Sequence, residues 1–499
     1  MNKTKKIQEK IVFNHYYHLR HDQKRTYILS KENENAKVLV ENMWISKVHP
    51  IYAMIFSFLS EPISTNKLYD ELSYFLDIKK QKVEEMIEPL INNAKTIINK
   101  YGSTISIFPK NIIIKESELN SKILHYTPEQ FAFSEIDLKQ ERIYLAPLNL
   151  LFVVNTNCFT NCAYCYADRK YKHNLLSVEK IKEIVRNAKI AGINNITISG
   201  GEFFLHKNWE EIMNILIEYD YNPGLISTKI PLGEEQILKI KTYNLAIQIS
   251  LDSLFDSNLQ EVLGVKSGYA EKISHSIKLL EKHNITYQIA TVITKLNNSI
   301  ENLEKIYDFI KDLKNMRRWE VRIVFRSLYS RGDFDAINVN RYTITEIDKY
   351  INTIKPNAKI NISWDSSGTD RYFTSTMGSK GFPGGRCSAN YCNMVILPDG
   401  KVTICEQLYW EPYFIIGDLT TQTIEEVWNS PMALKLANLN KDAFRDETIC
   451  KSCKLFDDCI SYNNRCVLDI VKAYGIKNID YPDPRCAKAP KFINELQPI

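Results

Sequence analysis

The chain has 499 residues, of which 44% are hydrophobic and 25% charged, and its formal net charge is +5. This length predicts roughly three structural units, and the composition is that of an ordinary globular protein. The small net charge does not indicate nucleic acid binding, and basic stretches such as residues 311–318 are interpreted as solvated helix faces. We recognise no secretory signal and no apolar run long enough to cross a bilayer, so we expect a cytoplasmic protein without a membrane partner.

The first 115 residues predict a small α+β domain of the winged-helix type. Helices are expected to open at Pro50, after Ser64-Thr65 and after Asp77, and Pro89 should kink or end the third. Alternating hydrophobic residues predict strands at 11–19, 25–31 and 37–42, and residues 103–114 are interpreted as the strand pair of a wing. Residues 116–147 are interpreted as a linker.

From residue 148 to residue 355, strand-like and helix-like segments alternate. This alternation predicts a parallel α/β sheet that forms a partial (β/α)6 TIM-like barrel, with its chemistry at the C-terminal ends of the strands. Strands are expected at 148–154, 195–199, 224–228, 245–251, 285–293 and 320–326. Helices are expected at 178–191, 208–219, 234–242, 269–283, 299–313 and 344–354.

Cysteine is confined to two parts of the chain. The first three, Cys158, Cys162 and Cys165, directly follow the first predicted barrel strand. Because no export signal accompanies the cysteines, metal ligation is favoured over disulfides. Three thiols in one loop leave one iron of a four-iron cluster open, whereas a structural zinc site takes four protein ligands. The remaining cysteines are Cys387, Cys392, Cys405, Cys450, Cys453, Cys459, Cys466 and Cys486.

The pattern Cys158-x3-Cys162-x2-Cys165, with an aromatic residue before the last cysteine, resembles the radical S-adenosylmethionine (SAM) superfamily. The second predicted strand ends in Gly-Gly-Glu, similar to a motif of that family. The resemblance implies that the loop holds a [4Fe-4S] cluster whose open iron chelates SAM, and that reductive cleavage of SAM yields a 5′-deoxyadenosyl radical. It also implies SAM contacts from Tyr164, Gly200, Gly201, Glu202, Ser227, Ser250, Asp252 and Arg326.

Two positions depart from the family pattern. Phe203 stands where Pro often follows the Glu, and Lys229-Ile230 stands where Asn-Gly often follows Ser-Thr. Arg322 and Arg326 share one parity on the sixth strand, so one of them would meet the SAM carboxylate. A salt bridge at the barrel rim is the alternative for this pair.

The C-terminal cysteines resemble the SPASM extension, which in its full form holds two auxiliary [4Fe-4S] clusters. Matching their order implies that Cys387, Cys392, Cys405 and Cys466 hold the first, and that Cys450, Cys453, Cys459 and Cys486 hold the second. The interval between Cys459 and Cys466 is longer than is usual in the family, and a zinc ribbon is the alternative for the Cys450-x2-Cys453 pair. Residues 356–486 would form this domain, with a hairpin turn at 397–400, a flexible entry at 378–385 and a tail at 487–499.

Similar enzymes modify ribosomally made peptides, and their N-terminal domain holds the leader of the precursor. The resemblance therefore implies an oxidoreductase that installs a thioether, carbon–carbon or ether crosslink or a similar oxidative modification. Its partners would be a small precursor peptide and an electron donor of the flavodoxin or ferredoxin type. Glu406, directly after Cys405, is the candidate catalytic base, with a surface carboxylate as the alternative.

Other functions stay open at this point. The N-terminal domain could instead read DNA or act as a structural cap. A sulfatase-maturating enzyme that generates formylglycine is the nearest enzymatic alternative, and an inactive peptide-binding scaffold is the alternative outside enzymes.

Overall fold

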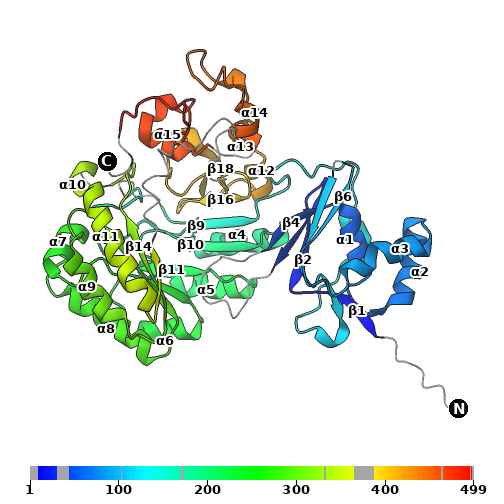
Figure 1. Cartoon of the computed structure of the whole chain (residues 1–499), viewed down its shortest axis with the longest axis horizontal. Helices are drawn as coiled ribbons and strands as arrows, with labels where there is room; N and C mark the ends of the chain where they lie inside the picture. The colour runs from blue at the N-terminus through cyan, green and yellow to red at the C-terminus, as the bar shows by residue number, and fades with distance from the viewer. Residues whose placement is uncertain are drawn as a thin grey trace. The chain divides into compact units, whose positions relative to one another are not determined.

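The fold is described from a computed structural model, which covers residues 9–30, 44–102, 104–169, 174–330, 333–364, 387–461, 465–494 and 496 (Figure 1). The chain forms two compact units, Met1–Leu145 and Ala146–Ile499. Each unit has its own sheets and its own buried residues. Among the described residues, no helix is both long and apolar enough to cross a membrane.

The first unit contains three small antiparallel sheets. Their strand orders are β5-β1-β8, β2-β3-β4 and β6-β7. The strands are β1 (Lys10–Phe13), β2 (Tyr17–His21), β3 (Thr26–Ser30), β4 (Ile45–Val48), β5 (Ile63–Ser64), β6 (Ile97–Tyr101), β7 (Thr104–Phe108) and β8 (Ile113–Lys115). Phe13 and Ile28 from the strands are fully buried in one core with Phe56, Leu68 and Leu72 from the helices.

The three helices of this unit are α1 (Pro50–Ser57), α2 (Thr65–Leu76) and α3 (Lys80–Ile87). The predicted start of α1 is confirmed: Pro50 lies in its first turn, and His49 Nδ1 accepts a hydrogen bond from the backbone of Ile51 at 3.1 Å. α2 begins at Thr65, one residue earlier than predicted, with Ser64 at its N-cap. α3 ends before a short 3-10 turn that carries Pro89, because proline cannot donate the next helical hydrogen bond.

Several predicted strands of the first unit need correction. Residues 11–19 are not one strand but parts of β1 and β2, which a turn separates. Residues 103–114 do not pair with each other: β7 pairs with β6, whereas β8 pairs with β1. Asn111, in the left-handed region at φ 53°, lies in the turn that sends the chain from one sheet to the other. The predicted strand at 37–42 lies outside the described residues, and the winged-helix interpretation stays a prediction.

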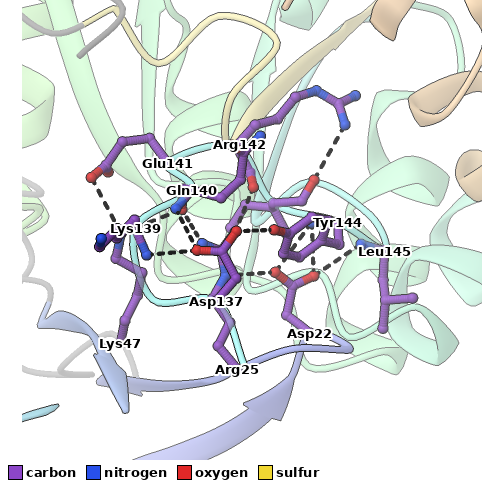
Figure 2. Close-up of polar contacts among 11 residues, drawn as sticks. Asp22, Arg25, Lys47, Asp137, Lys139, Gln140, Glu141, Arg142, Tyr144 and Leu145 are labelled. Atoms are coloured by element: carbon purple, nitrogen blue, oxygen red, sulfur yellow. Dashed lines mark hydrogen bonds and ion pairs between the residues drawn. The ribbon is translucent and has the colours of Figure 1, made fainter. Parts of the chain in front are cut away.

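A buried ion pair fixes the last segment of the first unit (Figure 2). Arg25 Nε lies 3.0 Å from Asp22 Oδ2, and both side chains are almost completely buried. The Asp22 carboxylate accepts hydrogen bonds from the backbone nitrogens of Tyr144 and Leu145 at 2.9 Å, and the Arg25 guanidinium donates to two backbone carbonyls of the same segment. The end of the predicted linker is therefore held on the strands of the first unit.

Two five-stranded sheets form the framework of the second unit. In one sheet, five strands run parallel in chain order: β11 (Leu225–Thr228), β12 (Ala246–Ser250), β13 (Tyr287–Ile293), β14 (Met316–Ile323) and β15 (Asn361–Trp364). In the other, β9 (Asn149–Val153) pairs in parallel with β10 (Asn195–Ser199). β10 lies next to β11 where the two sheets meet.

Helices alternate with these strands in the predicted order, and Figure 1 shows them beside the sheets. Six match the predicted helices: α4 (Val178–Ile190), α5 (Trp209–Glu218), α6 (Glu234–Thr242), α8 (Tyr269–Lys282), α9 (Ile300–Ile310) and α11 (Arg341–Ile354). The short helices α7 (Asp256–Leu263) and α10 (Phe334–Ile337) and the strand β15 were not predicted. The six predicted barrel strands correspond to β9 through β14, which confirms the α/β fold class.

The cysteine-rich region extends the sheet that contains β9. β16 (Asn393–Ile396) pairs in parallel with β9, and β17 (Lys401–Thr403) and β18 (Ile415–Asp418) follow in antiparallel pairing. The predicted turn is confirmed, since Leu397 N donates to Lys401 O at 2.8 Å and Gly400 has φ 90°. The helices here are α12 (Ile424–Trp428), α13 (Pro431–Ala437), α14 (Phe456–Ser461) and α15 (Val467–Tyr474). The predicted flexible entry at 378–385 lies outside the described residues.

Candidate functional site

The three-cysteine loop directly follows β9. Both Cys158 Sγ and Cys162 Sγ lie within 3.5 Å of the Thr160 hydroxyl, and the Cys165 nitrogen donates to the Cys162 carbonyl at 3.3 Å. The backbone nitrogens of Asn161 and Ala163 donate to carbonyls at the end of α7, at 2.7 and 2.8 Å. None of the three thiols forms a disulfide. The loop thus holds three free thiols close together on a fixed backbone.

Burial of this loop disfavours the negatively charged thiolate form of its cysteines. Burial raises the pKa of the Cys162 thiol to about 12, and the positive charge of Lys229 opposes that shift. Burial also raises the pKa of Cys165, where Lys229 again acts in the opposite direction. A cation or a metal cluster is therefore needed to hold these sulfurs as thiolates.

The Gly-Gly-Glu loop after β10 is joined to the backbone just before the cysteines. Gly201 N donates to Asn155 O at 2.9 Å, and Glu202 N donates to Asn157 O at 2.7 Å. A Cβ atom at Gly201 would lie 2.0 Å from Asn157 O, and one at Gly200 would lie 2.5 Å from Asn155 O. These two glycines, for which SAM contacts stay a prediction, let two loops of the chain approach each other in the structure.

Glu202 is buried and is held from the end of β11. Its carboxylate accepts hydrogen bonds from Thr228 Oγ1 at 2.7 Å and from the Lys229 backbone nitrogen at 2.8 Å. Burial raises its pKa, and these hydrogen bonds act against that rise. Glu202 is thus fixed beside the cysteine loop with an acceptor that suits an ammonium group.

Ser227, predicted to contact SAM, does not join Glu202. It is exposed, and its Oγ accepts a hydrogen bond from Gln248 Nε2 at 2.8 Å. Gln248 in turn accepts one from Gln288 Nε2 at 2.6 Å. These three side chains form a polar row across β11, β12 and β13, on the side opposite to Thr228.

Tyr164 and Asp252 are in direct contact. The Tyr164 hydroxyl donates to Asp252 Oδ2, and Asp252 Oδ1 accepts a hydrogen bond from Val292 N at 2.8 Å. Asp252 is completely buried, and Ser250, two residues earlier, is 7% exposed. Asp252 therefore ties the cysteine loop to β13.

The two predicted arginines lie in different places. Arg326 follows the end of β14, where its guanidinium lies 4.8 Å from the Phe334 ring centroid and 3.9 Å from Asp335 Oδ1. Arg322 is mostly exposed, and its guanidinium lies 2.8 Å from Glu320 Oε1. These contacts link Arg326 to α10, so its contact with SAM stays a prediction.

Glu406 lies near the cysteine loop rather than on a remote surface. Burial raises the pKa of its carboxyl group. Its charge acts on Tyr166, which is 38% exposed and forms a hydrogen bond with Ser199 at the end of β10. Tyr409, three residues after Glu406, packs in one apolar cluster with Ala167 and Cys165. A carboxylate with a raised pKa thus lies in the same region as the residues that follow Cys165.

The structure brings four of the C-terminal thiols together around Cys387. Burial raises the pKa of Cys392 to about 11 and that of Cys405 to about 12. Burial also raises the pKa of Cys466, and in all three cases the charge of Cys387 adds to the rise. The buried Arg485 acts in the opposite direction on Cys387. These are the thiols predicted to hold the first auxiliary cluster.

The other four C-terminal thiols form a second group. Burial raises the pKa of Cys450 to about 11, and the charges of Cys486 and Cys453 add to the rise. Burial likewise raises the pKa of Cys459 to about 12, with contributions from Cys450 and Cys486. The buried Arg465 opposes the rise at both Cys450 and Cys459.

Sequence reasoning missed three residues that build the site. Thr228, not Ser227, reaches Glu202; Lys229 lies among the thiols and carboxylates; and Tyr166 is affected by the charge of Glu406 and bonds to Ser199. A buried Thr228 follows from the alternation of β11, because the buried Ile226 has the same parity. Lys229 was visible only as a departure from the family pattern.

The donor set fits an iron–sulfur cluster and SAM. Within the described residues, no three His, Cys, Asp or Glu side chains converge as they would around a single metal ion. Thiols grouped as three, four and four instead suit four-iron clusters, which are held at their corners. At the group of three, Glu202 supplies the anionic partner that the amino group of SAM needs.

Comparison with known families defines the class of protein. Residues 152–310 match the radical SAM superfamily, and residues 387–454 match the SPASM iron–sulfur cluster-binding domain. Together with the parallel α/β fold and the three-thiol loop after β9, these matches show that the chain contains a radical SAM domain and a C-terminal SPASM domain. Its cofactors are accordingly SAM and [4Fe-4S] clusters.

The relatives are more specific. The chain is 22% identical over 328 residues to the antilisterial bacteriocin subtilosin biosynthesis protein AlbA of Bacillus subtilis. The aligned region covers 63% of this chain and 66% of AlbA. It is 23% identical over 266 residues to the sporulation killing factor maturation protein SkfB of the same species, with 52% and 60% covered. The chain thus spans less than two thirds of the length of these curated relatives.

A solved structure extends the comparison over almost the whole chain. Streptococcus suis SuiB bound to the precursor peptide SuiA has a TM-score of 0.61 at 16% identity, over 95% of this chain and 98% of that one. At this level of identity, the likeness establishes the fold.

Proposed function

We propose that the chain is a radical SAM/SPASM maturase that oxidatively modifies a ribosomally synthesised precursor peptide, for example by a thioether, carbon–carbon or ether crosslink. The observation that carries the proposal is the grouping of all eleven cysteines as three, four and four within one folded unit. The relatives that act in bacteriocin and killing-factor maturation, and the fold shared with a precursor-bound SuiB, support a peptide substrate.

Residues of the first thiol group would hold the radical-generating cofactors. Cys158, Cys162 and Cys165 would ligate the cluster, and Glu202 would accept a hydrogen bond from the amino group of SAM. When bound, the cluster and SAM would supply the 5′-deoxyadenosyl radical that takes a hydrogen atom from the peptide. Tyr164 and Asp252 would keep the cysteine loop in place on β13.

Glu406 would act as the base that removes a proton from the peptide. Its raised pKa gives it a higher proton affinity than an exposed glutamate, which suits a general base near neutral pH. In support of this role, the charge of Glu406 acts on Tyr166 and Tyr409, and Tyr409 is also affected by Cys165.

The eight C-terminal thiols would hold two auxiliary clusters in the groups described. Hydrogen abstraction followed by bond formation leaves one electron on the product, and these clusters would accept it. The buried Arg485 and Arg465 would stabilise the added negative charge. A flavodoxin or ferredoxin would supply the electron for SAM cleavage, and the reduced thiols are consistent with a cytoplasmic location.

The first unit would bind the leader of the precursor. Its antiparallel β2-β3-β4 sheet, followed by three helices, resembles elements to which an extended peptide adds a strand. Comparison of a full precursor with its leaderless core on the intact enzyme tests this role. Equal turnover of the two peptides would remove leader binding from the proposal.

Anaerobic reconstitution tests the proposed chemistry. Three four-iron clusters predict about twelve irons per chain, and SAM with dithionite should release 5′-deoxyadenosine. Cys162→Ala should abolish that release while keeping the auxiliary clusters. The peptide substrate is then sought by mass spectrometry among the products of short reading frames beside the gene. If the enzyme instead converts a sulfatase peptide to its formylglycine form, a sulfatase-maturating enzyme is favoured.

A further inference from the structure

Lys229 departs from the family pattern and lies at the centre of the site. Its backbone is fixed from both sides: the nitrogen donates to Glu202 Oε1 at 2.8 Å, and the carbonyl accepts a hydrogen bond from Tyr269 OH at 2.6 Å. The side chain is only 14% exposed. A long lysine side chain held in this way has a defined direction.

That direction is toward the cysteine loop. The ammonium lies 5.6 Å from the centroid of the Tyr164 ring and 3.9 Å from Asp252 Oδ2. The second distance is too long for a hydrogen bond, and Asp252 Oδ2 already accepts one from Tyr164. The N–H groups of the ammonium can therefore donate hydrogen bonds to a further anionic partner.

Negatively charged groups surround the ammonium of Lys229. The pKa of Lys229 is raised: burial alone would lower it, but the negative charges of Asp252, Cys162, Glu202 and Cys158 outweigh that effect. The two auxiliary thiol groups each have a buried arginine as neighbour, Arg485 and Arg465, whereas the first group has Lys229. All three thiol groups thus have a buried cation beside them.

We propose that Lys229 is the counter-cation of the radical cluster: its ammonium faces the thiolates of Cys158 and Cys162, stabilises the negative charge added on reduction, and pairs with the carboxylate of bound SAM. Three thiolates and an added electron concentrate negative charge in a buried site, and a nearby cation offsets it. The net charge around a cluster is one of the factors that set its reduction potential. The inference rests on the bound cluster and SAM, not on the identity of the peptide.

Two variants of the reconstituted full-length enzyme test the proposal. Lys229→Met removes the charge at similar length, and Lys229→Arg keeps it. Lys239→Met, on a partly exposed lysine of α6 that pairs with Glu210, is the matched control for loss of one positive charge. The radical cluster is identified as the EPR signal that is missing from Cys162→Ala.

We expect K229M to shift the midpoint potential of that signal to a more negative value and to weaken SAM binding by about tenfold or more, the usual effect of losing a partly buried charged hydrogen bond. K229R should stay close to the wild type in both measurements. Equal potential and equal SAM affinity in K229M and K239M, at equal iron content, would overturn the proposal.

Cluster loss is informative as well. If K229M fails to hold the radical cluster but K229R holds it, a positive charge is required at this position, which supports the proposal. If both variants lose the cluster, Lys229 has a structural role and the proposal is overturned. Neither measurement uses peptide turnover, so the absence of peptide modification in the wild type would count against the proposed function alone.

Discussion

Gly201→Ala should uncouple the Gly-Gly-Glu loop from the cysteine loop. The new Cβ would lie 2.0 Å from Asn157 O, far below the 3.4 Å at which ordinary contact begins, and a backbone carbonyl cannot rotate away as a side chain can. The loop must therefore shift, at the cost of its two hydrogen bonds to Asn155 and Asn157. Overpacking and these lost hydrogen bonds together cost about 2–5 kcal/mol.

The assay is urea unfolding of the unreconstituted protein, followed by SAM binding of the reconstituted one. Gly233→Ala is the control, since a Cβ there meets no atom within 4 Å and its φ is −84°. Because Gly233 is a helix N-cap, its replacement by alanine should lower the free energy of unfolding by less than about 1 kcal/mol. Equal free energies of unfolding for the two variants would refute the loop–loop contact as the reason for Gly201.

Three further outcomes are expected. Asp22→Asn leaves Arg25 without its buried partner and should destabilise the first unit by about 3–5 kcal/mol, which urea unfolding measures; an unchanged midpoint would contradict the anchoring role. Because a base acts only when deprotonated, peptide modification should fall as pH drops through the raised pKa of Glu406, and Glu406→Gln should lose this dependence in a pH–rate profile. Cys466→Ala and Cys486→Ala should each lose about four irons but different EPR signals; loss of the same signal would contradict the two groups.

Much of this architecture could be predicted from the sequence because the barrel strands are regular. Apolar runs such as 148–154 and 195–199 have the length and composition of buried parallel strands, and β9 and β10 follow them closely. The spacing of Cys158, Cys162 and Cys165 was equally informative, because these three thiols come from one short loop. Both signals are local in the sequence.

What could not be predicted depends on long-range contacts. β4 and β6 carry weak strand patterns in their own sequences, ISKV and IINKY, and β8 pairs with the distant β1 instead of the neighbouring β7. The choice of Thr228 over Ser227 depends on where Glu202 lies after folding. Lys229 stood out only by its difference from the family, and its role required its neighbours in space.

The pairing of β16 with β9 also constrains how the chain can be synthesised. Asn149 and Asn393 are joined by a side-chain hydrogen bond of 2.9 Å but are 244 residues apart. At usual translation rates, β9 leaves the ribosome roughly 10–50 s before its partner. During that interval the strand offers an unpaired edge to other chains, which is a known route to aggregation. Chains that end before residue 387 should therefore accumulate in insoluble form, and slow translation should increase the demand for chaperones.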